Sequence, residues 1–244
     1  MNERETLKQW VEESNYIVFF GGAGVSTESN IPDFRSTDGL YNQTYAYPPE
    51  TILSHTFYMR KTEEFYRFYR DKMLYTDAKP NKAHLALAKL EEEGKVRAVI
   101  TQNIDGLHQQ AGSKEVLELH GSVLRNYCMK CGKAADLNEL IRHMNESPDG
   151  VPRCDCGGIF KPDVVLYEEG LDSSIISRSV HHIAKADMLI IGGTSLAVYP
   201  AAGLIDYFNG KHLVLINRDA TARDTHADLV IREPIGQVLG EFLE

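Results

Sequence analysis

The sequence contains no hydrophobic run long enough to cross a membrane. Its longest apolar stretches, such as Tyr16–Phe20 and Met188–Ile191, are only a few residues long, whereas a transmembrane helix needs roughly 18 apolar residues. The first residues, Met1–Thr6, also lack the basic and apolar segments of a secretory signal. We therefore expect a cytoplasmic protein with no membrane partner.

A surplus of basic residues is also missing. The 244 residues include 26 Lys and Arg against 35 Asp and Glu, which gives a net charge of −9. A dedicated nucleic-acid-binding protein usually carries a basic stripe, so this balance argues against nucleic acid as a partner. An acidic surface attracts basic, lysine-bearing proteins, although acidity that serves solubility alone is the simpler interpretation.

Cysteine is absent outside one short region. The four cysteines are arranged as Cys128-x-x-Cys131 and Cys154-x-Cys156, with 22 residues between the two pairs. Such clustering in a cytoplasmic protein points to a metal rather than to disulfides. Four thiolates suit tetrahedral zinc, and because they leave no coordination position open, the zinc is expected to be structural. The second pair has one intervening residue instead of two, which is a less usual spacing.

Short apolar runs alternate with helical patterns, which predicts an α/β fold with a mostly parallel sheet. These runs are apolar on both faces, as in buried parallel strands. The expected strands are Tyr16–Phe20, Val96–Thr101, Val116–Leu119, Met188–Ile191, Leu213–Ile216 and Leu229–Ile231. The expected helices are a first one around Leu7–Val11, one capped by Asn81 and ended by Gly94, and two near Ser173–Lys185 and Pro200–Phe208.

Two stretches do not fit this alternation. Residues 35–75 are rich in Tyr, Thr and Pro and become amphipathic around Phe57–Met73. Residues 123–158 hold the cysteines and a short helix near Leu137–Met144. Both are expected to be insertions that together build a second, smaller lobe.

A glycine-rich turn, Gly21-Gly22-Ala23-Gly24-Val25-Ser26-Thr27, follows the first expected strand. Such a turn before a helix lets backbone N–H groups approach a phosphate. The dinucleotide fingerprint G-x-G-x-x-G is incomplete, because Thr27 stands where its third glycine belongs. Taken alone, the turn supports ligand binding and a purely structural role about equally. The segment after it is polar and broken by Pro32, and it brings Phe34 to cover a flat ring and Arg35 to pair with a phosphate.

A second glycine turn, Gly192-Gly193-Thr194-Ser195, follows a later strand. Two such turns from different strands are what a dinucleotide lying across the switch point of a parallel sheet requires. The hydroxyl groups of Thr194 and Ser195 suit phosphate or ribose. Asn217 also follows a strand, although ordinary turn chemistry explains Asn217–Asp219 slightly better when that segment is taken alone.

Polar side chains follow two further strands. Gln102, Asn103 and Asp105 come directly after the strand Val96–Thr101, and their amide and carboxyl groups suit a carboxamide, which both donates and accepts hydrogen bonds. His120 ends the strand Val116–Leu119 beside Gly121. Its ordinary pKa of about 6.5 makes it a candidate general base.

The order of these motifs resembles that of the sirtuin family. The segments that carry the resemblance are Gly22–Ser26, Ile31–Arg35, Thr101–His108, His120–Ser122, the split cysteine pairs, Lys161–Val165 and Gly193–Leu196. The resemblance runs from about residue 5 to the C-terminus, and it is specific because of the joint order rather than any single motif. It implies an NAD-dependent protein-lysine deacetylase of the bacterial type.

The resemblance also implies how one catalytic domain, residues 1–244, is divided. A large Rossmann-like lobe would comprise residues 1–34, 76–122 and 159–244. A small lobe would combine a helical insertion, residues 35–75, with a zinc module, residues 123–158.

Individual roles follow from the resemblance as expectations. Residues expected at the NAD phosphates and riboses are Ala23, Thr27, Arg35 and Gln102. The nicotinamide pocket is expected to contain Phe34, Ile104 and Asp105, and the adenosine half to contact Thr194, Ser195, Asn217 and Ile235. His120 and Asn103 are the expected catalytic residues, and Val165 and Tyr167 the expected contacts of the acyl-lysine.

The implied reaction transfers the acetyl group of acetyl-lysine to ADP-ribose, with release of nicotinamide and 2′-O-acetyl-ADP-ribose. His120 would activate a ribose hydroxyl that attacks an O-alkylamidate intermediate. Alternatives that use the same pocket are desuccinylation, other deacylation and mono-ADP-ribosyl transfer. A hydride-transferring dehydrogenase fits less well because the fingerprint is incomplete, and a zinc-ribbon binding module would leave the glycine turns unexplained.

Two departures from the sirtuin pattern bear on the substrate. Glu168-Glu169 stands where many sirtuins have Gly-Glu, so the conformation of that loop is an open question. Sirtuins that prefer succinyl or malonyl groups carry a Tyr and, three positions later, an Arg; here Tyr66 is followed by Tyr69. Burying an acyl carboxylate without a cation is costly, so we expect a preference for acetyl and other neutral acyl groups, unless Arg67 or Arg70 turns inward.

Overall fold

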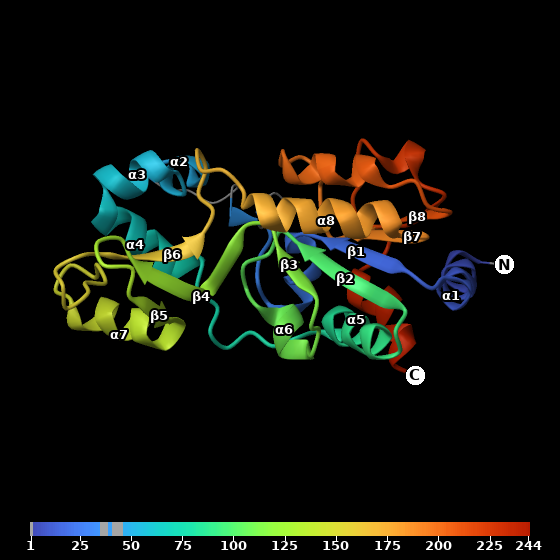
Figure 1. The fold of residues 1–244 in the computed structure, drawn as a ribbon, viewed down its shortest axis with the longest axis horizontal. Helices are drawn as coiled ribbons and strands as arrows, with labels where there is room; N and C mark the ends of the chain where they lie inside the picture. The colour runs from blue at the N-terminus through green and yellow to red at the C-terminus, as the bar shows by residue number, and fades with distance from the viewer. Residues whose placement is uncertain (1, 35–38, 41–45) are drawn as a thin grey trace.

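Parallel strands form the larger of two sheets in the computed structural model, which describes residues 2–34, 39–40 and 46–244 (Figure 1). Within those residues the sheet has six strands in the order β3-β2-β1-β7-β8-β9. The strands are β1 (Ile17–Gly21), β2 (Val96–Thr101), β3 (Val116–Glu118), β7 (Met188–Gly192), β8 (His212–Ile216) and β9 (Leu229–Ile231). The expected α/β class and all six expected strands are confirmed, and the strand order reverses between β1 and β7, as in Rossmann-like sheets.

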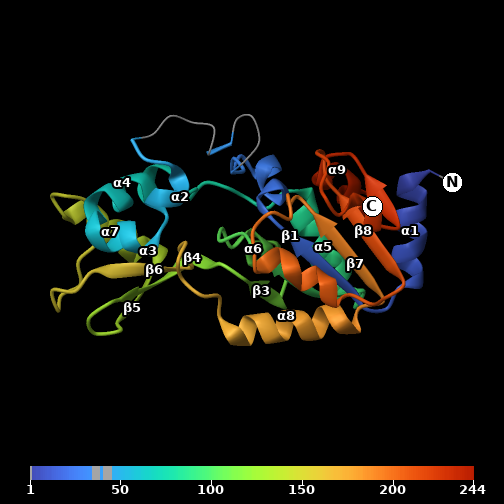
Figure 2. The ribbon, with the colours of Figure 1, turned by 90° about the horizontal axis from the view of Figure 1, so that it is seen from above.

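Helices cover both faces of this sheet (Figure 2). One face packs against α1 (Glu3–Glu13), α5 (Lys82–Glu92), α9 (Ile235–Leu239) and η6 (Gly240–Leu243), and the other against α8 (Ser173–Lys185) and η4 (Ala201–Tyr207). Side chains of β1 alternate between the two cores: Phe19 packs on the α5 face and Phe20 on the α8 face. Because both faces are covered, the central strands β1 and β7 are fully buried.

Local signals set the helix ends. Asn81 caps α5 as expected, because its side chain accepts a hydrogen bond from the N–H of Ala83. The chain leaves α5 through Gly94, which has a φ of +76°. The helical pattern near Pro200–Phe208 forms the 3-10 helix η4 rather than an α-helix.

Helix α1 places Trp10, the single tryptophan, against the large sheet. Trp10 stacks on the imidazole of His212 in β8, with 4.0 Å between ring centroids. Trp10 packs against the core cluster on the α5 face of the large sheet.

A separate antiparallel sheet with its own core forms the other end of the molecule (Figure 1). Its strands are β4 (Gly121–Cys128), β5 (Ala134–Asp136) and β6 (Phe160–Val164), in the order β5-β4-β6. The helices beside it are α2 (Pro49–Ile52), α3 (His55–Arg60), α4 (Thr62–Lys72) and α7 (Leu137–Glu146). We propose the division into lobes expected above with one shift: β6 pairs with β4, so the small lobe extends to about Val164.

Short helices occupy connections after β1, β2 and β8. They are η1 (Ala23–Val25), η2 (Thr27–Ser29), α6 (Leu107–Ala111) and η5 (Asp224–His226). Among the residues with described structure, no helix has both the length and the apolar composition needed to cross a bilayer.

Candidate active site

A cavity of about 1210 Å³ lies where the carboxyl ends of the large sheet face the small lobe. Fourteen of the residues expected at a site line it: Ala23, Thr27, Phe34, Gln102, Asn103, Ile104, Asp105, His120, Val165, Tyr167, Thr194, Ser195, Asn217 and Ile235. Arg35 lies outside the described residues. The chain thus brings together side chains that follow five strands of the large sheet (β1, β2, β3, β7 and β8) and side chains of the small lobe.

The glycine turns after β1 and β7 contact each other in the wall of this cavity. The N–H of Gly24 donates to the carbonyl oxygen of Gly193 at 2.8 Å. A Cβ atom at Gly193 would lie 2.4 Å from the backbone nitrogen of Val25, and Gly193 has a φ of +59°. Only glycine fits this contact. Without side chains, the backbone where the strand order reverses between β1 and β7 stays accessible to a ligand.

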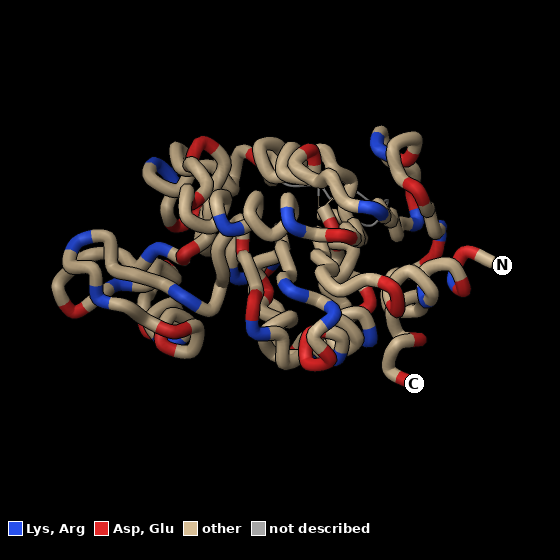
Figure 3. The backbone as a smooth tube through the Cα atoms, turned by 45° about the vertical axis from the view of Figure 1, so that its right-hand side comes forward, with Lys and Arg blue, Asp and Glu red and all other residues tan. Residues whose placement is uncertain are grey.

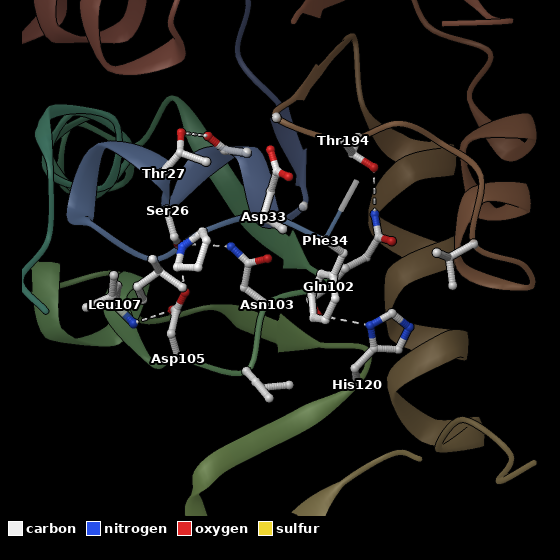
Figure 4. A pocket seen from close by; sticks show the side chains of 18 of the residues that line it. Ser26, Thr27, Asp33, Phe34, Gln102, Asn103, Asp105, Leu107, His120 and Thr194 are labelled. Atoms are coloured by element: carbon white, nitrogen blue, oxygen red, sulfur yellow. Dashed lines mark hydrogen bonds between the residues drawn. The ribbon is translucent and has the colours of Figure 1, made fainter. Parts of the chain in front are cut away.

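A chain of hydrogen bonds joins the strand ends across the cavity. Asn217 forms two of them with Thr194: its Oδ1 accepts from the N–H at 3.0 Å, and its Nδ2 donates to the carbonyl oxygen at 2.9 Å. The Thr194 hydroxyl oxygen accepts from Nε2 of Gln102 at 3.0 Å (Figure 4). Asn217, for which turn chemistry was slightly favoured, therefore holds the second glycine turn in place.

Ser26 connects two of the expected residues, and sequence reasoning assigned it no role. Its hydroxyl donates to Oδ2 of Asp105 at 2.7 Å and accepts from Nδ2 of Asn103 at 3.1 Å (Figure 4). The other oxygen of Asp105 accepts from the N–H of Leu107 at 2.9 Å. The carboxylate is thereby fixed in orientation. The available signal was the place of Ser26, directly after the glycine turn at a strand end.

His120 is half-buried, and its Nδ1 lies 2.9 Å from the carbonyl oxygen of Gln102 (Figure 4). A carbonyl oxygen only accepts, so Nδ1 carries the proton and Nε2 has the free lone pair. Burial lowers the pKa of His120 below its ordinary value, against the opposing effect of the bond to Gln102. The neutral imidazole is thus the stable form at neutral pH, which suits a general base.

The loop after β6 contributes Val165 and Tyr167. The N–H of Val165 donates to the carbonyl oxygen of His120 at 3.0 Å. Tyr167 pairs with the small lobe through its N–H, which donates to Leu53, and its carbonyl oxygen, which accepts from His55. Within the described part of the chain, no hydrogen bond uses the carbonyl oxygen of Val165.

The four cysteines form a zinc-binding site away from this cavity. Their Sγ atoms all lie within 4.8 Å of one another, with 3.5 Å between Cys128 and Cys156 and 3.8 Å between Cys131 and Cys154. Tetrahedral zinc with bonds of about 2.3 Å requires sulfur atoms about 3.8 Å apart. None of these cysteines lines the cavity, so the site supports the small lobe and takes no direct part in chemistry.

The two tyrosines considered for acyl selectivity lie in the small-lobe core. Tyr66 and Tyr69 are fully buried there and do not line the described cavity, and the Tyr66 hydroxyl donates to the carbonyl oxygen of Phe160. Arg67 points outward and pairs with Glu63 at 2.9 Å, and Arg70 is exposed. Neither arginine turns inward.

Comparisons with known proteins agree with this geometry. The sequence profile of the Sir2 family matches residues 22–200. The NAD-dependent protein deacetylase of Clostridium acetobutylicum is 65% identical over 236 residues, which cover 96% of this chain and 95% of that protein. A solved complex of Sir2 with a p53 peptide and NAD+ is 39% identical, with a TM-score of 0.87, and the match covers 100% of this chain and 98% of the other. A Sir2 complex with the inhibitor EX-527, 2′-O-acetyl-ADP-ribose and a deacetylated p53 peptide is 36% identical, with a TM-score of 0.85 and coverage of 98% and 97%.

Proposed function

This chain belongs to the Sir2 family, and we infer that it is an NAD-dependent protein-lysine deacetylase. The observation that carries this inference is the position of His120. Its unprotonated Nε2 lines the same cavity as the two touching glycine turns, so a base lies next to a site suited to a dinucleotide.

The cavity fits NAD as a cosubstrate. The glycine contact leaves open backbone at the switch point for the phosphates, beside Ala23 and Thr27. We assign the adenosine half to Thr194, Ser195, Asn217 and Ile235, and the ribose next to nicotinamide to Gln102. Arg35 keeps its expected role at the phosphates as part of the proposal.

We assign the nicotinamide to the pocket of Phe34, Ile104 and Asp105. Because Ser26 and Leu107 each donate a hydrogen bond to Asp105, its carboxylate is held in one orientation. It can then accept from the amide NH₂ of a carboxamide. Asn103, which shares Ser26 with Asp105, is the second proposed catalytic residue and would orient the reacting ribose.

The acetylated peptide is proposed to enter between the loop Val164–Tyr167 and the segment Gly193–Ala197 as an added strand. The unused carbonyl oxygen of Val165 would accept from the N–H of the acetyl-lysine amide, and Tyr167 would form part of the wall around its side chain. Apolar neighbours such as Leu166 and Ile104 exclude water from the acyl group.

NAD supplies the sugar carbon that receives the acetyl oxygen as nicotinamide departs. The chain's part is to hold the weakly nucleophilic amide in line with that carbon, and then to remove a ribose hydroxyl proton at Nε2 of His120. The Gln102 carbonyl stabilises the imidazolium that results, because Nδ1–H keeps donating to it. One water molecule is consumed as the C–N bond to the lysine amine breaks, and the proposed products are free lysine, nicotinamide and 2′-O-acetyl-ADP-ribose.

The test is nicotinamide release in the presence of NAD, with an acetyl-lysine peptide or its unmodified counterpart, and products identified by mass spectrometry. We expect release only with the acetylated peptide, together with acetyl-ADP-ribose, and loss of deacetylation in His120→Ala with an unchanged circular dichroism spectrum. Peptide-independent release would identify an NAD hydrolase, and ADP-ribose attached to protein would identify a transferase. Either result would overturn the proposal.

We further propose that acetylated proteins and NAD, rather than nucleic acid or membranes, are the partners of this chain. The net charge of −9 supports this choice, and Lys and Arg lie interspersed with Asp and Glu over the described backbone (Figure 3). A cytoplasmic location remains part of the same proposal.

A further inference from the structure

Glu168 has a backbone conformation that non-glycine residues rarely adopt. Its φ is +76°, in the left-handed region, at the position where many sirtuins carry glycine. A side chain in this region is disfavoured by contact between Cβ and the backbone. The loop therefore keeps the turn expected with glycine, but something must hold Glu168 in it.

The side chain of Glu168 provides a tether. Its Oε2 accepts from the N–H of Thr56 at 2.9 Å, at the start of α3. The hydrogen bonds from Thr56 lower the pKa of Glu168, and the nearby side chains of His55 and Arg60 act in the same direction. The carboxylate is therefore ionised and bonded to the helical part of the small lobe.

The neighbouring Glu169 also fixes this loop, through contacts with β6 and with the start of α3. Its carboxylate accepts from Nζ of the buried Lys161 at 3.2 Å, from Nδ1 of His55 at 2.8 Å and from the N–H of Leu166 at 2.9 Å. Burial alone would raise the pKa of Glu169, but these three partners lower it overall. Lys161 also donates to the carbonyl oxygen of Val164 at 3.0 Å.

The backbone completes a bridge between helix and catalytic strand end. Tyr167 donates to Leu53 at 2.9 Å and accepts from the N–H of His55 at 3.0 Å, while Val165 donates to the carbonyl oxygen of His120 at 3.0 Å. The segment 165–169 is thus fixed to α3 on one side and to His120 on the other. Its position determines where the carbonyl oxygen of Val165 lies relative to the imidazole.

We propose that Glu168 is a positioning residue for the acyl-peptide: by bonding to Thr56 it holds the loop 165–169 against α3, so that the edge that receives the peptide is formed before the peptide binds. This rests on the proposed function. Releasing the tether leaves the NAD half of the cavity intact, since that half is built from the large sheet. The effect should therefore fall on the peptide and spare NAD.

Three variants separate the tether from the backbone conformation. Glu168→Ala removes the tether and keeps a side chain at positive φ, Glu168→Gly removes the tether and suits the φ, and Glu168→Gln keeps an acceptor oxygen. Loss of one hydrogen bond to a charged group corresponds to roughly a tenfold effect. We expect KM for the acetyl-peptide to rise about tenfold in the Ala and Gly variants and less than about threefold in the Gln variant, with kcat at saturating peptide and KM for NAD unchanged.

The control is Glu63→Ala, which removes an exposed glutamate of the same lobe that does not line the cavity. Amide hydrogen exchange supplies a second readout, because protection at Tyr167 and His55 should fall in the Ala and Gly variants only. Wild-type KM for the peptide in Glu168→Gly, which folds without strain at this position, would overturn the inference, as would a loss confined to kcat or to NAD. A wild-type protein without peptide-dependent deacetylation would instead overturn the proposed function.

Discussion

The acyl group that the cavity accepts can be predicted from the charges around it. The cavity wall that faces the small-lobe core is apolar and includes Leu53, Val164 and Leu166. Three positions after Tyr66, where an arginine would supply a cation, α4 has the buried Tyr69, and the neighbouring Arg67 points outward to Glu63. A succinyl group would thus place its carboxylate against apolar side chains.

The cost of that placement sets the expected selectivity. An ionised carboxylate taken from water without a partner costs several kcal/mol in real proteins. We take this cost as about 4 kcal/mol. Because each factor of ten in kcat/KM corresponds to about 1.4 kcal/mol, kcat/KM for succinyl-lysine should be about a thousandfold below that for acetyl-lysine. The neutral amide of succinyl-lysine, which has nearly the same size, should recover most of the difference if charge is the cause.

The measurement is kcat/KM for one peptide sequence carrying acetyl, propionyl, succinyl or succinamide-type lysine, followed by mass spectrometry of the peptide. Succinyl turnover within tenfold of acetyl turnover would refute the reasoning. In that case Lys72 is the residue to test, because it is a cation in the described cavity wall at the end of α4. If Lys72 pairs with the succinyl carboxylate, Lys72→Gln should lower the turnover of succinyl-lysine. Poor turnover of the neutral amide as well would mean that size, and not charge, limits the acyl group.

Three further predictions concern protons and the metal. Because burial lowers the pKa of His120 and the base must be neutral, kcat/KM should stay level as the pH falls to about 6.5 and decline only below it; a decline centred above pH 6.5 in a pH–rate profile would contradict this. Burial lowers the pKa of His84 to about 4, so the stability that its neutral form contributes is complete above pH 6.5 and is lost as the pH falls towards 4, by about 3 kcal/mol; urea unfolding at several pH values should show this loss in the wild type and a shallower one in His84→Gln. Elemental analysis should find one zinc per chain, and Cys154→Ala should lose the metal and lower Tm in calorimetry, because structural zinc contributes directly to folding; an unchanged Tm in the metal-free variant would exclude a structural role.

Much of the large lobe could be predicted because its signals are local. Buried parallel strands are mostly apolar, so runs such as Val96–Thr101 can be recognised in the sequence as strands. The capping residue Asn81 likewise indicates where α5 begins. The parallel sheet then brings together polar residues that follow different strands. Gln102 and Thr194, 92 positions apart, meet in this way.

The small lobe and the details of the site were harder to predict because they depend on tertiary packing. Strand β6 contains Lys161 and Pro162, which is not a strand pattern, and its pairing with β4 became visible only in the structure. Tyr66 matches a family position by sequence, yet its side chain bonds to Phe160 in the core. The loop at Glu168 keeps a glycine-like turn because the backbone N–H of Thr56, which is far away in sequence, donates a hydrogen bond to the Glu168 carboxylate.

The lone tryptophan makes the two halves of this molecule separately observable. Trp10 belongs to the core of the large lobe, whereas Tyr58, Tyr66 and Tyr69 are packed together in the small one. Tryptophan fluorescence, excited at wavelengths that tyrosine does not absorb, reports on the large lobe. Tyrosine absorbance reports mainly on the small lobe, which holds the zinc site. A single unlabelled sample can therefore reveal by its optical signals whether the lobes melt together or in succession.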